Sequence, residues 1–152
     1  MAKNGPAGLD TKAVVKVLNQ LLELELAGVV RFNHYALMVF GHARIPIVAW
    51  LRGEASEAMG HAQKLGEWIT ALGEHPSLKI GTLLETHRHQ IDDILKEVLE
   101  HEQEGLGCYR ELLALAEGKD VALEEFARGM IELETTHVHE VGKMLRRPGT
   151  LS

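Results

Sequence analysis

The sequence contains a single cysteine, Cys108, so no internal disulfide can form. It also lacks an apolar run long enough to cross a membrane. The most hydrophobic stretch, residues 36–51, is interrupted by His42, Arg44 and Pro46, whereas a spanning helix needs about 20 apolar residues. The first ten residues contain no apolar segment of the kind found in signal peptides. These features predict a cytoplasmic protein without membrane contacts.

The sequence also has fewer basic residues than acidic ones. The formal net charge of -6 at pH 7 argues against general binding to nucleic acid and favours the collection of cations. With 152 residues, 45% of them hydrophobic and 25% charged, the chain is predicted to form one globular domain with a substantial core.

Four amphipathic helices, separated by glycine and proline, account for most of the chain. After a loose N-terminal arm, residues 1–10, and an N-cap at Asp10 or Thr11, the predicted helices cover residues 11–41, residues 46–72, a third segment starting between 82 and 89 and ending near 118, and residues 121–146. The segment 74–86 is long enough to be a crossover, whereas the other two connections are tight turns. The pattern predicts an all-α, antiparallel four-helix bundle over residues 11–147, with one long crossover between the second and third helices and a short tail, residues 148–152.

The fourth predicted helix carries two polar side chains on its apolar face. Glu134 and His137 are three residues apart, so they share a face of the helix and can reach one metal ion. A carboxylate buried on such a face costs several kcal/mol unless a positive charge meets it. The apolar members of the same stripe are Leu123, Ala127, Met130, Val141 and Met144.

The other three predicted helices also carry acidic residues on their apolar stripes, and none of these stripes contains Lys or Arg. The inward acids are Glu25, Glu54 and Glu102, and His61 adds a second imidazole. Because no basic side chain neutralises these groups, they imply a pair of metal ions in the core. Carboxylates with two imidazoles and no thiolate suit iron or manganese.

The two halves of the chain repeat this arrangement. Glu25 and Glu57 are as far apart in the sequence as Glu102 and Glu134, and the two histidines follow their first acids with spacings that differ by one residue. This agreement suggests a core with pseudo-twofold symmetry, in which each helical hairpin offers one Glu on its first helix and a Glu with a His on its second.

At these residues the chain resembles the bacterioferritins. One Glu from each of two helices and a Glu-x-x-His from each of the other two is the ferritin-like di-metal pattern. The matching residues are Leu18-Asn19-Gln20-Leu21-Leu22 with Glu25, Glu54 and His61-Ala62, Glu102 with Tyr109-Arg110-Glu111, and Glu134 with His137. The resemblance implies a di-iron centre in which Glu25 and His61 belong mainly to one iron and Glu102 and His137 to the other. It also implies that Glu134 bridges the two ions.

One position departs from the family pattern. Three residues before His61, where bacterioferritins place a second bridging Glu, this sequence has Ala58. Glu57 lies close enough round the helix to share an ion with His61. Around the helix, Glu54 is better aligned with His61, but it lies about 10 Å from His61 along the helix axis. This position suits a residue that lines the path by which an ion approaches the site. Either Glu57 completes the site, or the site holds one ion firmly and the other loosely.

The resemblance also concerns assembly. Met59 stands where bacterioferritins carry the methionine that ligates haem b between two subunits, and it faces away from His61 on the helix. The alternative for Met59 is an ordinary dimer contact. Bacterioferritins close their shell with a fifth helix, whereas only Pro148 to Ser152 remain here after Arg147. The resemblance therefore implies a homo-oligomer, at least a dimer, and leaves shell formation open.

Together these observations predict a protein that binds ferrous iron, oxidises it with dioxygen or peroxide, and stores or detoxifies the product. The residues expected to do so are Glu25, His61, Glu102, Glu134 and His137, with Glu57 as a further ligand. One alternative is a di-iron oxidase or peroxidase that stores no mineral. Another is a structural or regulatory bundle with a degenerate site, for which Ala58 is the best argument.

Overall fold

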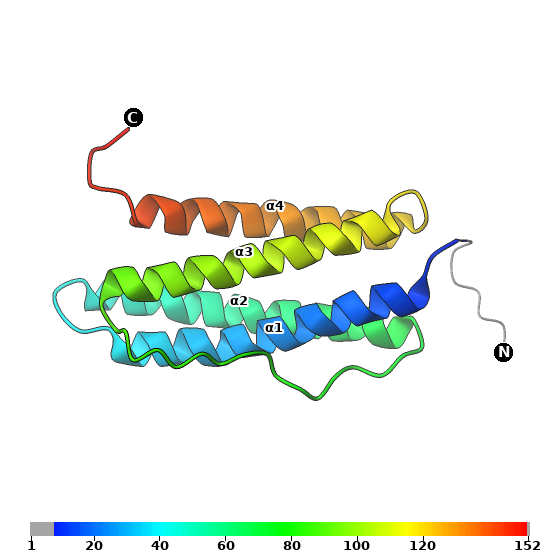
Figure 1. The fold of residues 1–152 in the computed structure, drawn as a ribbon, viewed down its shortest axis with the longest axis horizontal. Helices are drawn as coiled ribbons and strands as arrows, with labels where there is room; N and C mark the ends of the chain where they lie inside the picture. The colour runs from blue at the N-terminus through cyan, green and yellow to red at the C-terminus, as the bar shows by residue number, and fades with distance from the viewer. Residues whose placement is uncertain (1–7, 152) are drawn as a thin grey trace.

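The computed structural model describes residues 8–151, which form four long helices and no strand (Figure 1). Residues 1–7 of the predicted arm and Ser152 lie outside the described part. The helices are α1 (Thr11–Met38), α2 (Arg44–Ala71), α3 (Ile91–Ala116) and α4 (Val121–Met144). The chain is an all-α four-helix bundle, which confirms the predicted fold class.

Local sequence signals set the ends of the two helical hairpins. The Asp10 carboxylate accepts a hydrogen bond from the Ala13 backbone N–H at 3.1 Å, and Asp120 caps α4 in the same way. The turns within the hairpins contain Gly41 (φ +96°) and Gly118 (φ +71°), in the left-handed region that glycine adopts without steric cost. Each hairpin therefore brings two antiparallel helices together through a short turn.

Several helix ends differ from the sequence prediction by two or three residues, and the backbone explains two of them. α1 ends at Met38 rather than near residue 41, because Val39 is already extended, with ψ 120°. α3 begins at Ile91, later than the predicted window of 82 to 89. The backbone before it cannot join the helix, because Leu84 and His87 have positive φ, 36° and 55°.

The crossover between α2 and α3 returns along the length of the bundle beside α1, so α2 and α3 run parallel (Figure 1). The Ser77 backbone N–H donates to the Asn19 side chain at 2.7 Å, and the Gly81 N–H donates to the Glu23 carbonyl at 2.8 Å. A Cβ atom at residue 81 would lie 2.9 Å from that carbonyl oxygen, so this close approach requires glycine. These bonds hold the crossover against α1.

The core consists of two apolar clusters at opposite ends of the bundle. One contains residues 14–22 of α1 and 109–116 of α3, and the other contains residues 32–39, at the end of α1 and just after it, and 94–98 of α3, with parts of α2 and α4 in each. Glu25, His61, Glu102, Glu134 and His137 fall between these clusters. The apolar ends fix the positions of the helices, and a polar layer lies between them.

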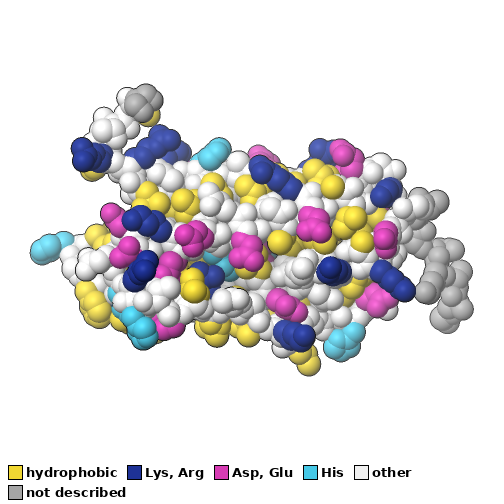
Figure 2. All heavy atoms as spheres, in the orientation of Figure 1, with side chains coloured by type: hydrophobic (Ala, Val, Ile, Leu, Met, Phe, Trp, Pro, Cys, Tyr) yellow, Lys and Arg dark blue, Asp and Glu magenta, His cyan; other side chains and the backbone are white. Residues whose placement is uncertain are grey.

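The surface is mixed in charge. Figure 2 shows acidic and basic side chains interspersed over one face, which therefore carries no continuous basic patch. None of the helices in the described residues is sufficiently long and apolar to cross a bilayer.

Candidate metal centre

Three helices contribute the first group of converging donors. Glu25 from α1, His61 from α2 and Glu134 from α4 are all buried, and their ligand atoms lie within 4.8 Å of one another. His61 Nδ1 lies 3.4 Å from Glu25 Oε1 and 3.6 Å from Glu134 Oε1. The separations match donors that share one ion, since metal–nitrogen and metal–oxygen bonds of about 2.1 Å put neighbouring donors roughly 3.4 Å apart.

A second group lies beside the first. It consists of Glu54 from α2, Glu102 from α3 and His137 from α4, again with ligand atoms within 4.8 Å of one another. His137 Nδ1 lies 3.5 Å from Glu54 Oε2 and 3.6 Å from Glu102 Oε2.

Glu134 connects the two groups. Its Oε1 atom lies 3.6 Å from His61 Nδ1, and its Oε2 atom lies 3.7 Å from His137 Nδ1. One carboxylate thus faces the histidines of both halves, which is the arrangement a carboxylate needs to bridge two ions.

Glu54 and Glu57 have different places in the structure. The Glu54 side chain is 11% exposed and lies within the second donor group, although the sequence suggested that it lines an ion's approach. The Glu57 side chain is 50% exposed, and its Oε2 atom lies 3.0 Å from His137 Nε2, the ring nitrogen that the donor group does not use. Glu57 thus lies at ion-pair distance from the outer ring nitrogen of His137, on the side where carboxylates beside metal-bound histidines commonly act as partners.

Comparison with known proteins shows the family of the chain. Residues 15–148 match the ferritin family, described as the ferritin-like domain. The chain belongs to this family. No curated protein gave a significant sequence match.

Solved structures of ferritin-like proteins have the same fold. A ferritin-like, diiron-carboxylate protein from Bacillus anthracis str. Ames is 26% identical, with a TM-score of 0.85 over 90% of this chain and 98% of that one. The bacterioferritin-related dodecameric thioferritin from Bacteroides fragilis is 22% identical, with a TM-score of 0.81 over 91% and 87% of the two chains. The Desulfovibrio desulfuricans bacterioferritin, which has a diiron site, is 20% identical, with a TM-score of 0.76 over 89% and 79%.

The carboxylates of the central site in this ferritin-like chain are poorly solvated. Burial, reinforced by Glu102 and Glu25, raises the pKa of Glu134 to about 10. Burial also raises the pKa of Glu102 to about 7, although its contact with Glu134 lowers it. Burial also raises the pKa of Glu54. Burial alone lowers the pKa of His61, but contact with Glu25 and Glu134 outweighs it, so that pKa is raised. Without a cation the site therefore retains protons on its acids, and a bound cation would displace them.

Tyr109 positions one of the acids. Its hydroxyl donates a hydrogen bond to Glu25 Oε1 at 3.0 Å, and burial raises the pKa of this phenol, so it remains a donor. Because the tyrosine is fully buried in the apolar cluster at one end of the bundle, it holds Glu25 at the edge of the polar layer.

One basic side chain is buried outside the predicted stripes, because Arg31 is only 7% exposed. Its guanidinium donates to the Tyr35 hydroxyl at 3.0 Å and lies 3.1 Å from His101 Nδ1, and Tyr35 donates to Glu97. Burial, aided by Arg31, lowers the pKa of His101 to about 4, so this imidazole is neutral. Arg31 thus belongs to a separate buried network, and the carboxylates of the centre do not pair with it in the described residues.

Residues 58 and 59 of α2 face opposite environments. Ala58 is buried and lines the cavity that holds the donor groups. Met59 is 41% exposed on the outer side of the bundle, where Gly53 and Gly60 leave open space above the helix. Met59 therefore faces away from the donor groups, as the helical spacing predicted.

Three polar residues that were not predicted to form a site come together outside this centre. They are His34 on α1 and Glu85 with His89 on the crossover. Glu85 and His89 are only four residues apart, but no spacing in the sequence links them to His34, which the path of the crossover brings beside them.

Proposed function

We propose that this ferritin-like chain binds two ferrous ions between its two apolar clusters and oxidises them with dioxygen or peroxide. The observation that carries the proposal is Glu134, whose two oxygens face the histidines of both halves. The donor set fits iron, because carboxylate oxygens and imidazoles stabilise both ferrous and ferric ions.

The chain's own residues would bind and orient the substrate ions. Glu25 and His61 would hold one ion, Glu102, His137 and Glu54 the other, and Glu134 would bridge them. Each ferrous ion would supply one electron, so two ions together can reduce dioxygen to the level of peroxide. Protons leave the buried acids as the ions enter, which removes the desolvation cost of the metal-free site.

Oxygen consumption during ferrous titration tests the proposal. We expect about two Fe(II) bound per chain and about one dioxygen consumed per two ions oxidised. Failure to bind iron would favour the structural bundle with a degenerate site.

Because related ferritin-like proteins assemble, we further propose a homo-oligomer that stores ferric product. Retention of more than about two irons per chain after desalting supports storage, and retention of only two favours a di-iron oxidase or peroxidase.

Glu54 and Glu57 provide a matched pair of variants. Glu54→Ala removes a donor from the group that contains Glu102 and His137, so we expect one of two ferrous affinities to fall at least about tenfold. Glu57→Ala removes only the partner of the outer ring nitrogen and should have a smaller effect on the same ion. Anaerobic calorimetric titration measures both. If Glu57→Ala is the more damaging variant, Glu57 is the ligand and this assignment is reversed.

Met59 gives a separate prediction about haem. If two copies pair through the outer face of α2, Met59 of each can ligate a haem b between them. Protein produced with ample haem should then show a Soret band that Met59→Ala abolishes while iron oxidation continues. A Soret band of undiminished intensity in Met59→Ala would leave this methionine as a packing residue.

A further inference from the structure

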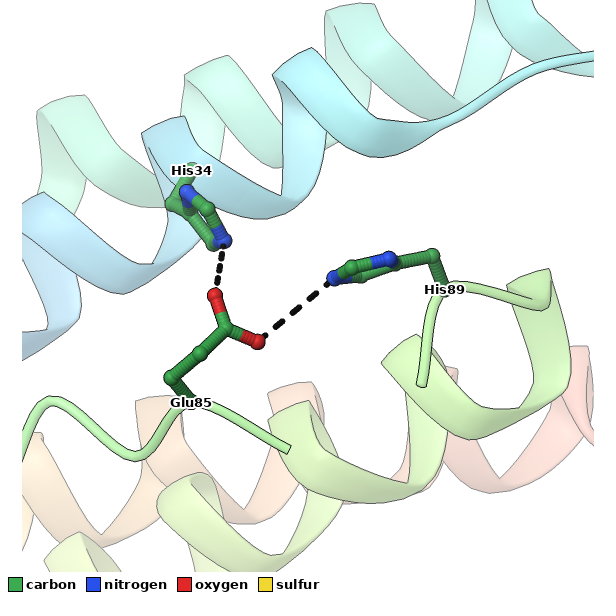
Figure 3. A group of neighbouring side chains, drawn as sticks. All are labelled: His34, Glu85 and His89. Carbon is green, nitrogen blue, oxygen red and sulfur yellow. Dashed lines mark ion pairs between the residues drawn. The ribbon is translucent and has the colours of Figure 1, made fainter. Parts of the chain in front are cut away.

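Outside the central site, His34, Glu85 and His89 meet at the bundle surface (Figure 3). His34 is on α1, Glu85 is on the crossover, and His89 lies two residues before the start of α3. Their ligand atoms all lie within 4.8 Å of one another. Two segments distant in sequence, α1 and the end of the crossover, thus present two imidazoles and one carboxylate to a common point.

The distances between these donors suit a shared ion. His34 Nε2 lies 3.0 Å from Glu85 Oε2, and His89 Nε2 lies 3.6 Å from Glu85 Oε1. Donors bound to one transition ion at about 2.1 Å are separated by roughly 3.4 Å in tetrahedral geometry. Figure 3 shows the two imidazoles approaching the Glu85 carboxylate from different directions, each facing a different one of its two oxygens.

His34 carries the second observation. Its Nε2 atom is shielded from solvent and has no hydrogen-bond partner among the described residues, although Glu85 is close. The contact therefore has the distance but not the alignment of a hydrogen bond. A buried polar nitrogen without a partner is uncommon in folded proteins and calls for a ligand, water or ion.

The backbone on both sides of Glu85 has an unusual conformation. Leu84 and His87 both have φ in the left-handed region, which costs a non-glycine residue about 1–2 kcal/mol. The crossover is anchored there because the Thr86 hydroxyl donates to Glu97, and the His87 N–H donates to Glu85 Oε1 at 2.7 Å. These contacts hold the part of the crossover that carries Glu85 beside α1, where the Glu85 carboxylate meets His34.

We propose that His34, Glu85 and His89 form a second metal site, which binds one divalent transition-metal ion such as Zn²⁺ and fastens the crossover to α1. Two imidazoles and one carboxylate are ligands that Zn²⁺ and neighbouring ions prefer, with solvent completing the coordination. The site shares no residue with the two donor groups of the central site. It therefore does not depend on the proposed oxidation of iron.

Zinc titration of metal-free protein tests this site. All measurements use a His61→Ala, Glu134→Ala and His137→Ala background, which removes both imidazoles and the bridging carboxylate of the central site, so any remaining tight site is independent of it. We expect one zinc site in this background, and His34→Ala or His89→Ala should weaken it at least about tenfold. His42→Ala is the matched control, since His42 is an exposed histidine outside the cluster and should leave zinc affinity unchanged. Equal affinity in His34→Ala, His89→Ala and His42→Ala would overturn the proposal.

Hydrogen exchange provides a second test, which measures protection of backbone amides instead of zinc affinity. Zinc should slow amide exchange over residues 82–90, because an ion ties this part of the crossover to α1. His34→Ala should lose this protection while keeping its helical circular dichroism, since the His34 side chain is 44% exposed and supports little of the core. Zinc-dependent protection that persists in His34→Ala would contradict the proposed ligand set.

Discussion

Replacing Glu134 by Ala will abolish iron oxidation and reduce the number of ferrous ions bound per chain. Glu134 is the residue whose two oxygens face both His61 and His137, so its removal affects both ions. Loss of even an outer partner of a metal ligand costs 10–100-fold, and we expect loss of the bridge to lower the oxidation rate by more than about 100-fold. Stopped-flow absorbance of the ferric product measures this rate.

Unfolding would not explain such a loss. Glu134 is a buried carboxylate with an unfavourable environment in the metal-free protein, so Glu134→Ala should unfold at a temperature equal to or above that of the parent. Glu132→Ala is the matched control, because Glu132 is an exposed acid on the same helix. Oxidation at the parent rate in Glu134→Ala would remove the basis of the proposed function.

The metal-free protein will lose stability as the pH rises from about 5 to 8. Glu102 and Glu134 have folded-state pKa values of about 7 and about 10, above those of unfolded carboxyl groups. The folded state therefore binds more protons than the unfolded state in this range, so its advantage is complete below pH 4 and is lost as pH rises through the folded pKa values. His61, whose pKa is also raised, contributes in the same direction.

The size of this effect can be estimated from Glu102 alone. A folded-state pKa of about 7 corresponds to a loss of about 3 kcal/mol in the free energy of unfolding by pH 8. This loss lowers the unfolding temperature by roughly 6–12 °C. Calorimetry of chelator-treated protein at several pH values measures it. Glu134→Gln should flatten the dependence, whereas Glu132→Gln should not. An unfolding temperature that stays constant between pH 5 and 8 in metal-free protein would show that these acids are better solvated than the structure indicates.

Much of the central site could be predicted because its geometry is local. The three-residue spacing of Glu134 and His137 puts both on one helix face, and the stripes that contain Glu25 and Glu102 define the inward side of α1 and α3. The structure brings these residues together between the two apolar clusters. Periodicity along a single helix therefore carries the information needed to choose candidate ligands.

Relations between helices could not be predicted in the same way. Glu54 was judged by its distance along α2 from His61, but its neighbour in the structure is His137 on α4. Arg31 lies beside the inward stripe of α1, and its burial depends on Tyr35 and on His101 of α3. Both cases depend on which helix faces which, and helical periodicity does not contain that information.

Metal-free crystals soaked anaerobically with Fe(II), with diffraction recorded at the iron absorption edge, would locate the bound ions. We expect two anomalous peaks about 3.5–4 Å apart, one beside Glu25 and His61 and the other beside Glu102 and His137, with the Glu134 carboxylate between them. The absence of iron from this layer, or a single peak that does not contact Glu134, would contradict the proposed function.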